Sequence, residues 1–512
     1  MPVAFRPGSA LRFRLQPGTF LYDCHAGELA PSDGADLAAG FVPFFHAALF
    51  GVTPGAWHPY YAEQVRAIAA LAPEERDAYV ASLRPKRSLD AAARLAAFAF
   101  PDAERFVKLV PGAEGPFVLR EELLFPGNPP LGALEGRSAE APGWSSLLPE
   151  GALATAAGRA AVARTLARLA RGEHAGVAQG GDPLEAAFLD AANAAGLLAP
   201  AERRPPAAAP PPGVYAVGHS ALLIRGARTG LLIDPIFGSR LASVAGAFSF
   251  AELQEHVDAV ALTHGHFDHY HLPTLLAAGD RPIFVPPVGR ASIVCEDLAA
   301  RLSSFGLRGV RAPAWGSTFS VGELTVHVLP FIGEQFLTSE RYPEARNWGS
   351  SYVVEVAGRR VFVAADSGFE PGRSVIELVR SWCDAHGPID VVAAQAIALG
   401  NSFGTGDADL QLTGMTCANR APEAFALARR EARVTLGVED IPALCAATGA
   451  TRFLPYGQFR FARGEPACLS GLVDRLARTL ASARPETAVC ALAIGQGLSL
   501  DPGGAAIAGA LG

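Results

Sequence analysis

The eleven residues LTHGHFDHYHL, from Leu262 to Leu272, hold four histidines and one aspartate. They follow the apolar run VDAVAL, which predicts a short buried strand that ends near Thr263. Imidazole and carboxylate are side chains that bind divalent first-row metals without the help of thiolates. Any fold that this chain adopts must therefore present a ligand-rich loop at the end of a buried strand.

The spacing within this loop predicts two metal positions. His264 and His266 lie two apart on an expected extended loop, so they can converge on one metal. Asp268 and His269 lie at the expected turn into a helix, from which they can reach a second metal. Because both imidazole and carboxylate are suitable ligands, the pattern HxHxDH is a specific signal for a metal site.

Short apolar strands alternate with helices from residue 214 onward, which predicts a layered α/β domain. In such a domain the loops at strand ends are well placed to present ligands. The expected strands are GVYAVGHSALLIRG, TGLLIDP, VDAVALTH, RPIFVPP, ELTVHVLP, SYVVEV, RRVFVAADSG, IDVVAAQ and TRFLPYG, and the expected helices are RASIVCEDLAARLSSFG, PGRSVIELVRSWCDAHG, APEAFALARREAR and EDIPALCAATGA.

A proline-rich segment, ERRPPAAAPPPGV, has no amphipathic period and predicts an extended linker over residues 202–213. The length of 512 residues also favours two domains. We expect residues 1–201 to form a mostly helical α+β domain and residues 214–512 to form the catalytic domain. In the first of these, RFVKLVPG and PFVLREELLF are expected to be short strands, and helices are expected near residues 59–83 and 151–171.

Charge and composition exclude several functional classes. A formal net charge of -7 gives no overall basic field for a polyanion, so nucleic acid is not an expected partner. The first thirty residues lack the apolar core of a signal peptide, and no long uninterrupted apolar segment predicts a membrane span. Seven dispersed cysteines without a CxxC pair are typical of reduced thiols, so we expect a cytoplasmic protein.

Three motifs, in the expected order, give the chain a resemblance to the metallo-β-lactamase fold between about residues 214 and 459. GHSALLI and LLIDP are similar to its opening strands, HGHFDH to its signature, and VAADSGF to the segment whose aspartate bridges two metals. The resemblance implies an αββα sandwich with a dinuclear site at one sheet edge. It implies His264, His266, Asp268 and His269 as ligands and Asp366 as the bridging carboxylate.

Three further residues have implied roles outside the ligand set. Asp234 matches a buried aspartate that supports the site by contacting its ligands. His271 and His219 stand at positions that the family does not use for ligands. We expect each of them to support the ligands or to have a purely structural role.

The chain departs from the hydrolases of this fold at two positions. Those hydrolases supply a histidine from the loop before the bridging aspartate, whereas here that loop offers Glu334, with Gln335 beside it, and His327 lies inside an expected strand. They also supply a late histidine after a strand ending in proline, but no histidine follows His386. Near that strand end we expect Tyr456 to act as a hydrogen-bond donor.

The remaining ligand set shifts the expected metal from zinc to iron. Nitrogen-rich sets are common for zinc in hydrolases, whereas oxygen-rich sets with open positions suit iron that reacts with O₂. We therefore expect two iron ions, with two zinc ions as the alternative. The expected set combines three histidines with three carboxylates: His264, His266, His269, Glu334, Asp268 and Asp366.

This altered set resembles the diiron β-hydroxylases of nonribosomal peptide pathways, which serve antibiotic biosynthesis. The resemblance rests on HGHFDH, PFIGEQF, AADSG and the overall architecture. It implies a non-haem diiron monooxygenase that hydroxylates the β-carbon of an aminoacyl thioester on a peptidyl carrier protein. The reaction would use O₂ and two electrons from an external donor, and the hard chemistry would belong to the metals.

Several alternatives remain open for the surface that docks the carrier protein and for the role of the N-terminal domain. Basic clusters at residues 84–87 or at Arg301, Arg308 and Arg311 can serve as a docking face for an acidic carrier or simply as a solvated surface. The N-terminal domain can shield the site, dock the carrier or mediate homodimerisation. The long polar loop over residues 396–422 is expected to contact substrate.

Two other functions compete with the hydroxylase. A metal-dependent hydrolase of the lactonase or phosphodiesterase kind would use a metal-bound hydroxide to attack an ester. The two missing histidines count against it. A non-catalytic binding module is weaker still, because the signature ligands and the bridging aspartate are all intact.

Overall fold

A computed structural model describes most of the chain after residue 124 and several short segments before it. The described residues are 3–17, 19, 107–109, 117–119, 125–141, 143–172, 182–201, 209–244, 246–292, 295–333, 348–370, 372–396, 435–468, 470–500, 506–507 and 511.

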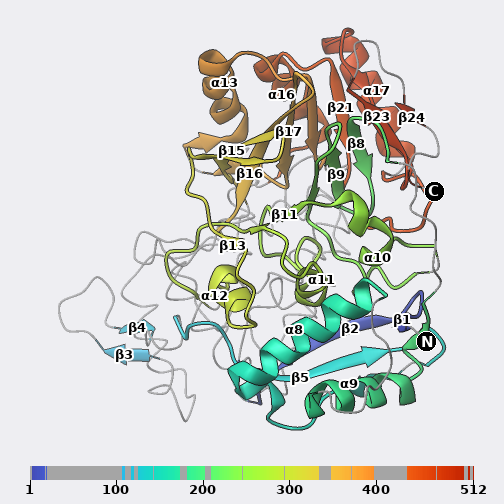
Figure 1. Ribbon diagram of the computed structural model, residues 1–512. Coiled ribbons are helices and arrows are strands. Elements are labelled where there is room, and N and C mark those ends of the chain that lie inside the picture. The colour runs from blue at the N-terminus through green and yellow to red at the C-terminus, as the bar shows by residue number, and fades with distance from the viewer. Residues whose placement is uncertain are drawn as a thin grey trace, which may run out of the picture.

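Two large β-sheets face each other in the C-terminal part of the chain (Figure 1). The first sheet has the order β13-β12-β11-β10-β9-β8-β23-β24 and the second the order β14-β15-β16-β17-β20-β21-β22. In the first sheet the bounds are β8 Gly213–Ala216, β9 Leu222–Arg225, β10 Gly230–Ile233, β11 Ala259–Ala261, β12 Ile283–Phe284, β13 Val310–Arg311, β23 Gly497–Ser499 and β24 Ala506–Ile507. In the second they are β14 Thr318–Val321, β15 Leu324–Pro330, β16 Ser350–Val356, β17 Arg359–Ala365, β20 Val391–Ala394, β21 Arg452–Pro455 and β22 Ala488–Val489.

The central strands of the second sheet are buried on both faces, which explains why β20 and the second half of β17 are continuously apolar. Along β17, Val361 and Val363 join the core between the sheets, whereas Phe362 and Ala364 join a separate core beneath helices. This alternation follows from the two-residue period of a strand. The covering helices are α13 (Val375–His386), α16 (Ile441–Thr448) and α17 (Ser470–Ala483), as Figure 1 shows.

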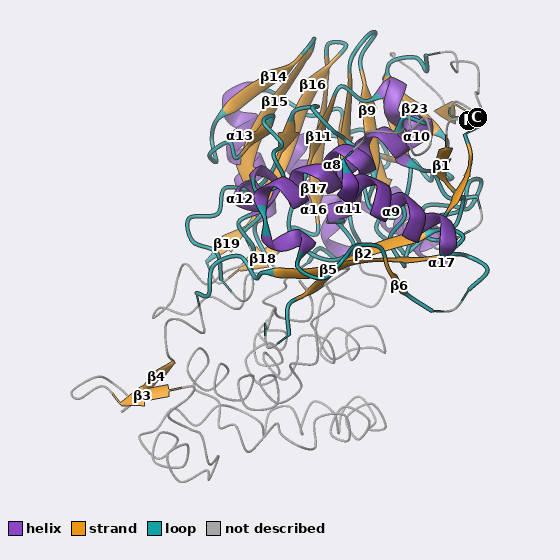
Figure 2. Cartoon of the chain, turned by 60° about the horizontal axis from the view of Figure 1, so that its bottom comes forward, coloured by secondary structure: helices purple, strands orange, loops and turns teal. Residues whose placement is uncertain are grey.

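The outer face of the first sheet is covered by shorter helices and by the N-terminal region. These helices are α10 (Phe250–Leu253), α11 (Leu272–Ala277) and α12 (Leu298–Ser303). Against α11 packs α8 (Ala156–Ala170), followed by α9 (Pro183–Ala194), and Figure 2 shows both beside the sheet formed by β2 (Ala10–Leu15), β5 (Leu131–Arg137) and β6 (Ser145–Ser146). The C-terminal part is thus a metallo-β-lactamase-type sandwich with helices outside both sheets.

One continuous hydrophobic core joins the N-terminal elements to the first sheet. Phe13 of β2 and Leu166 of α8 belong to the same buried cluster as Leu231 of β10 and Leu275 of α11. The remaining N-terminal strands are β1 (Val3–Phe5), which pairs with β7 (Leu198–Pro200), and the hairpin of β3 (Val107–Leu109) and β4 (Phe117–Leu119). The boundary at residues 202–213 remains a prediction, and β8 begins at its last residue.

The predicted strands after residue 213 are confirmed, except that GVYAVGHSALLIRG forms two antiparallel strands, β8 and β9, and not one. The short strands around residues 107 and 117 and the helix in 151–171 are also confirmed. One helix prediction is wrong in part, because residues 290–306 form a helix only over α12 and pair Ser292 with Cys295 as an isolated bridge. Helices α10 and α17 were not predicted. The expected helices at 59–83 and 421–433 lie outside the described residues.

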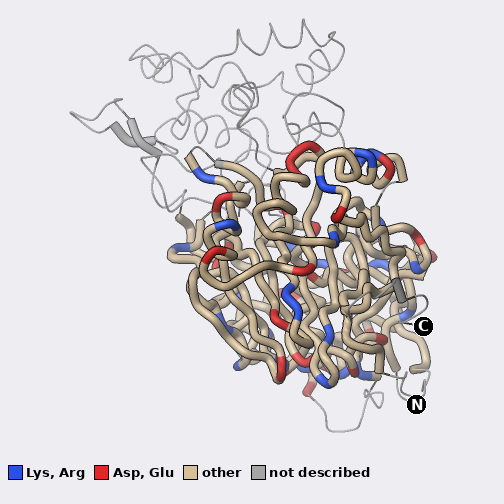
Figure 3. The backbone as a smooth tube through the Cα atoms, turned by 90° about the horizontal axis from the view of Figure 1, so that it is seen from above, with Lys and Arg blue, Asp and Glu red and all other residues tan. Residues whose placement is uncertain are grey.

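The charge distribution and the length of the helices in the described part of the chain both bear on the expected partners. Figure 3 shows acidic and basic residues interspersed over the described chain, in agreement with the absence of a dominant basic field expected from the net charge. Within the described ranges, no helix combines the length and the apolar character that crossing a membrane requires.

Candidate metal centre

The ligand-rich loop lies where the two sheets meet. After β11 the chain pairs with the second sheet, because His264 forms a bridge with Gly349 and the Ser350 amide donates to the Thr263 carbonyl at 2.7 Å. The phenol of Tyr352 donates to the carbonyl of Leu262 at 2.6 Å. These contacts fix the backbone from which the predicted ligands project.

Asp234, directly after β10, organises the loop from beneath. Its carboxylate accepts hydrogen bonds from the amide of Thr263 at 2.7 Å and from the hydroxyl of Thr263 at 2.5 Å. The same carboxylate lies 2.8 Å from Nδ1 of His269. Asp234 adopts a φ of 49°, a left-handed conformation that few residues other than glycine adopt at low cost. The supporting contact expected for Asp234 is therefore present in the structure.

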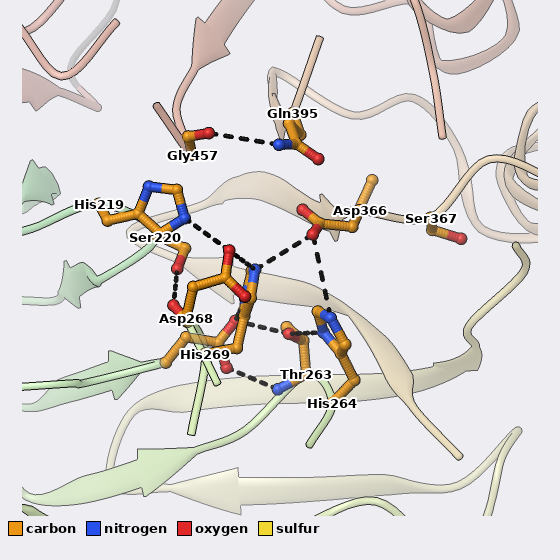
Figure 4. A network of polar contacts seen from close by, with 12 residues as sticks. His219, Ser220, Thr263, His264, Asp268, His269, Asp366, Ser367, Gln395 and Gly457 are labelled. Atoms are coloured by element: carbon orange, nitrogen blue, oxygen red, sulfur yellow. Dashed lines mark hydrogen bonds and ion pairs between the residues drawn. The ribbon is translucent and has the colours of Figure 1, made fainter. Parts of the chain in front are cut away.

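His264, His269 and Asp366 converge at the centre of the network in Figure 4. Asp366 Oδ2 lies 3.2 Å from His269 Nε2 and 3.9 Å from His264 Nε2. All three residues are buried, and their ligand atoms lie within 4.8 Å of one another. Asp366 follows Ala365, whose φ of 51° turns the chain at the end of β17. Buried imidazole and carboxylate donors at this spacing fit a divalent cation.

A second cluster combines Asp268 with His269 and His219. Asp268 Oδ2 lies 2.9 Å from His219 Nε2 and 3.8 Å from His269 Nε2. Burial opposes the charged form of Asp268, but His269 and His219 together hold its pKa well below the usual range. The carboxylate is therefore charged at neutral pH and is able to bind a cation.

The charge on His269 depends on its neighbours. Burial lowers its pKa, but the carboxylates of Asp366 and Asp268 and its hydrogen bond to Asp234 raise it well above the usual value. The carboxylates outweigh the effect of burial, so the electrostatic field at Nε2 of His269 strongly favours a positive charge. A metal ion at this point would supply that charge in place of a proton.

Two other predicted residues lie close to these clusters. The ring of His266 is 4.4 Å from that of His264, centre to centre, at an angle of 71°. Tyr456, directly after β21, is buried, and burial together with Asp234 and Asp366 raises its pKa well above the usual value. Its phenol therefore stays protonated at neutral pH and keeps a hydrogen to donate.

Glu334 and Gln335 lie outside the described residues, but the chain just before them is anchored at the site. The ring of Phe331 stacks on His264 at 4.7 Å. The Ser367 hydroxyl accepts from the Ile332 amide and donates to the Ile332 carbonyl, both at 2.8 Å. The loop that carries Glu334 thus starts beside Asp366.

His271 makes its hydrogen bonds away from the ligand clusters. Its Nδ1 lies 2.7 Å from Thr274 Oγ1 and its Nε2 lies 3.0 Å from the carbonyl oxygen of Leu11. Burial lowers the pKa of His271 to about 4. His271 therefore ties the loop to β2. This contact is structural, which is one of the two roles that the sequence left open for His271.

One suggested docking residue is corrected by the structure. Arg301 is buried and pairs with Glu296 and with the carbonyl of Pro129, so it is not part of a solvated docking face. The spacing of arginines at 301, 308 and 311 could not reveal the contact with Pro129, which is distant in sequence. The cluster at residues 84–87 and most of the loop 396–422 lie outside the described residues.

The sequence analysis missed two small residues that support the site. Thr263 joins Asp234 to His264, since its Oγ1 also lies 3.0 Å from His264 Nδ1. Ser367 anchors the loop before Glu334. A signal was available for both, because each hydroxyl residue is adjacent in sequence to a predicted ligand.

Comparison with known proteins places this geometry in context. Residues 229–385 match the beta-lactamase superfamily domain. Over 155 residues the chain is 32% identical to the 4-amino-L-phenylalanyl-[CmlP-peptidyl-carrier-protein] 3-hydroxylase of Streptomyces venezuelae. The matched segment covers 30% of this chain and 28% of that protein. Over 173 residues it is 30% identical to a metal-dependent hydrolase of Myxococcus xanthus. This second match covers 31% of this chain and 53% of the hydrolase.

The sequence matches thus span about a quarter and about half of the two curated relatives, whereas the structural match is far more extensive. The crystal structure of CmlA, a diiron beta-hydroxylase from Streptomyces venezuelae, has a TM-score of 0.54 at 16% identity and covers 96% of this chain and 98% of that chain. The likeness at this identity establishes a common fold. The C-terminal part of the chain therefore has a metallo-β-lactamase fold, with a match to the beta-lactamase superfamily domain over residues 229–385, and the chain shares its overall fold with CmlA.

Proposed function

We propose that this protein is a non-haem diiron oxygenase that hydroxylates the β-carbon of an aminoacyl thioester on a peptidyl carrier protein. The relative from Streptomyces venezuelae acts, by its name, on an aminoacyl group carried by such a protein. One oxygen atom of O₂ would enter the substrate C–H bond, and the other would leave as water with two external electrons and two protons. The iron pair, when bound, supplies the activation of O₂.

In the proposed ligand arrangement, His264, His266 and Glu334 would hold one iron and Asp268 and His269 would hold the other. Asp366 would serve both. The position of Asp366 supports this arrangement, because its Oδ2 approaches one histidine of each set, His264 at 3.9 Å and His269 at 3.2 Å. A carboxylate between two cations is well suited to bridge them.

Glu334 is proposed as a ligand on the strength of its neighbours. The described chain reaches Gly333, one residue earlier, and successive Cα atoms are about 3.8 Å apart. Ile332 is held by Ser367, the residue after Asp366, and Phe331 stacks on His264. A carboxylate this close along the chain can reach a metal bound to His264.

The observation that favours iron over zinc is the end of β21. Hydrolases of this fold place a histidine there, whereas the described segment here runs Tyr456, Gly457, Gln458, Phe459 and offers no imidazole. No histidine follows His386 anywhere in the chain. The donor set is thus rich in carboxylate oxygen, which stabilises an oxidised metal and suits iron that reacts with O₂.

The protein's own residues orient and shield this site. Asp234 contacts His269 and, through Thr263, also His264, so Nε2 of both rings would be available to a bound metal. Tyr456 lies buried beside Asp366 and keeps its phenolic hydrogen, so it can donate to a polar group bound there. The buried surroundings exclude bulk water, which strengthens each of these electrostatic contacts.

The test combines metal analysis with product analysis. Protein produced with iron should contain about two irons per chain and, with O₂ and a chemical reductant, should add one oxygen atom to an aminoacyl group loaded on a carrier protein. Mass spectrometry of the released amino acid measures the addition. Two tightly bound zinc ions and no oxygen incorporation from ¹⁸O₂ would contradict the proposal.

A metal-dependent hydrolase is the second candidate, and the similarity to the Myxococcus xanthus protein favours it. The zinc-loaded protein would then cleave lactones or phosphodiesters by a metal-bound hydroxide. Assaying iron-loaded and zinc-loaded protein side by side against both substrate classes distinguishes the two functions.

The Glu334→Ala variant tests the ligand assignment directly. It should retain about one iron per chain and lose hydroxylation, because one iron would keep only two histidines and the bridge. Glu150→Ala, which alters an exposed glutamate, is the matched control and should bind two irons. Full iron content and activity in Glu334→Ala would show that the assignment is wrong.

A further inference from the structure

His219 is completely buried and touches both a predicted ligand and a distant loop. Its Nε2 lies 2.9 Å from Asp268 Oδ2, and its Nδ1 accepts a hydrogen bond from the backbone amide of Phe459 at 2.6 Å. Its ring also stacks on the Phe459 ring at 4.3 Å and 17°. Figure 4 shows His219 on the side of Asp268 opposite Asp366.

The partner at Nδ1 determines where the ring hydrogen of His219 lies. A backbone N–H can only donate, so the Nδ1 that faces Phe459 must carry a lone pair. The hydrogen of the neutral ring therefore lies on Nε2, where it donates to the carboxylate of Asp268. His219 is thus a hydrogen-bond donor to Asp268.

His264 and His269 show the opposite arrangement. Nδ1 of His269 faces the Asp234 carboxylate, which only accepts, so the lone pair of the neutral ring lies on Nε2. The hydroxyl hydrogen of Thr263 is donated to Asp234, which leaves its oxygen to accept from Nδ1 of His264. Metal-binding histidines have this pattern, with the second nitrogen donating to an acceptor.

We propose that His219 is a positioning residue that orients Asp268 for metal binding, and that the Phe459 amide holds it in the required tautomer. His219, Asp268 and His269 have donor atoms close enough to share one metal, yet the tautomer of His219 directs a hydrogen rather than a lone pair toward them. The inference rests on the proposed role of Asp268 as a ligand. It does not depend on the identity of the metal or on hydroxylation.

Neighbouring contacts also fix the backbones of His219 and Asp268. The carbonyl of His219 accepts from the Gly457 amide at 2.8 Å, and the hydroxyl of Ser220 donates to the Asp268 carbonyl at 2.8 Å. The backbone and the side chain of Asp268 are thus both held by the dipeptide His219–Ser220. This double attachment leaves the carboxylate little freedom to rotate.

The conformation of Phe459 also points to a role for its amide. Its φ of 51° is unusual for a bulky residue, yet 52% of the residue remains exposed. Burial of the ring therefore does not account for the strained backbone. The strain coincides with the hydrogen bond to His219 Nδ1, as expected where a local geometry serves a site.

The first experiment compares two variants of His219. His219→Phe keeps an aromatic ring against Phe459 but has no donor for Asp268. His219→Gln places an amide oxygen and an amide NH₂ where they can replace Nδ1 and Nε2–H. His327→Phe, on β15, is the matched control for the loss of a histidine.

Titration of metal-free protein with Co²⁺, followed by its visible absorption, measures both metal positions. His219→Phe should weaken one of the two positions about 10–100-fold, the usual effect of removing a group that orients a ligand. His219→Gln should recover most of the affinity, and His327→Phe should bind like the unchanged protein. Unaltered Co²⁺ binding by a folded His219→Phe variant would overturn the proposal in favour of simple packing.

The second experiment reads the tautomer directly and remains decisive if a variant fails to fold. In metal-free protein labelled with ¹⁵N-histidine, NMR should place the hydrogen of His219 on Nε2, and Zn²⁺ should leave it there. A hydrogen on Nδ1, or direct bonding of Nε2 to Zn²⁺, would overturn the inference. An unchanged protein that binds only one Co²⁺ would contradict the dinuclear proposal, whereas the tautomer of the metal-free ring would still decide the role of His219.

The Phe459→Gly variant separates the amide from the aromatic ring. Glycine adopts the positive φ readily and keeps the N–H that faces His219. Co²⁺ binding and the His219 tautomer should therefore be preserved. A shift of the hydrogen to Nδ1 in this variant would show that ring stacking, and not the amide, selects the tautomer.

Discussion

Asp234 Oδ2 lies 2.8 Å from Nδ1 of His269, and neither side chain is exposed to solvent. The same carboxylate oxygen accepts the hydroxyl hydrogen of Thr263, which in turn contacts His264. One carboxylate therefore sets the orientation of two imidazoles that are proposed to hold different metals. Such outer contacts commonly change metal affinity by a factor of about 10–100.

Asp234→Asn should weaken metal binding at both positions by about 10–100-fold. Asparagine keeps the size of the side chain and tolerates the positive φ, so the loss would come from the acceptor at His269 and not from the backbone. Metal titration of the metal-free variant measures the change. Asp258→Asn is the control, since Asp258 accepts from the Gly230 amide near the other end of these strands. Equal affinity in the two variants would argue against the orienting role.

Asp366→Asn should reduce the bound metal from two ions per chain to one or none, because the bridging charge is lost. After burial, Asp366 is the largest influence on the pKa of His269, and it raises that pKa. The variant should therefore lower the pKa of His269 in the metal-free protein, which histidine NMR can follow. Asp390→Asn, which alters a partner of Arg359, serves as the control. Two tightly bound metals in Asp366→Asn would exclude the bridge.

Ser367→Ala should destabilise the fold by about 1–3 kcal/mol, because the buried amide of Ile332 would lose its partner, whereas the Ile332 carbonyl would keep the Gly368 amide. It should also weaken iron binding if the neighbouring Glu334 is a ligand. Chemical denaturation measures the first effect and iron titration the second. Ser351→Ala is a suitable control, as the hydroxyl of this buried serine donates to the Ala364 carbonyl over a long distance of 3.5 Å. A loss of stability with unchanged iron affinity would separate Ser367 from the metal site.

His271 predicts a dependence of stability on pH. Burial lowers its pKa to about 4, below the ordinary value of 6.5, so the folded protein resists protonation that the unfolded chain accepts. The contribution is complete above pH 6.5 and is lost as the pH falls from 6.5 to about 4, by at most about 3 kcal/mol. His271→Gln keeps a donor for Leu11 and should lack this acid-sensitive part. Urea unfolding of both proteins at pH 7.5 and 5 tests it, and parallel losses would exclude His271 as the cause.

Much of the site is readable from the chain because its ligands are local. His264, His266, Asp268 and His269 fall within six residues after an apolar strand, so their type and spacing predict a metal loop. The strand before them was predictable for the same reason, since short-range apolar periods decide where strands begin and end. The alternation along β17, with Val361 facing one core and Phe362 the other, was not predictable, as both faces are apolar.

The amino-acid sequence by itself determined the metal loop, the strand pattern and the absence of the late histidine. Only the tertiary structure decided which way each side chain points. Asp234 contacts His269 across 35 residues, Phe459 contacts His219 across 240, and His271 turns away from the metal loop to reach Leu11, 260 residues earlier. A ring nitrogen becomes a ligand, a donor or a structural contact according to what faces its other nitrogen, and in this protein packing between distant segments supplies that partner.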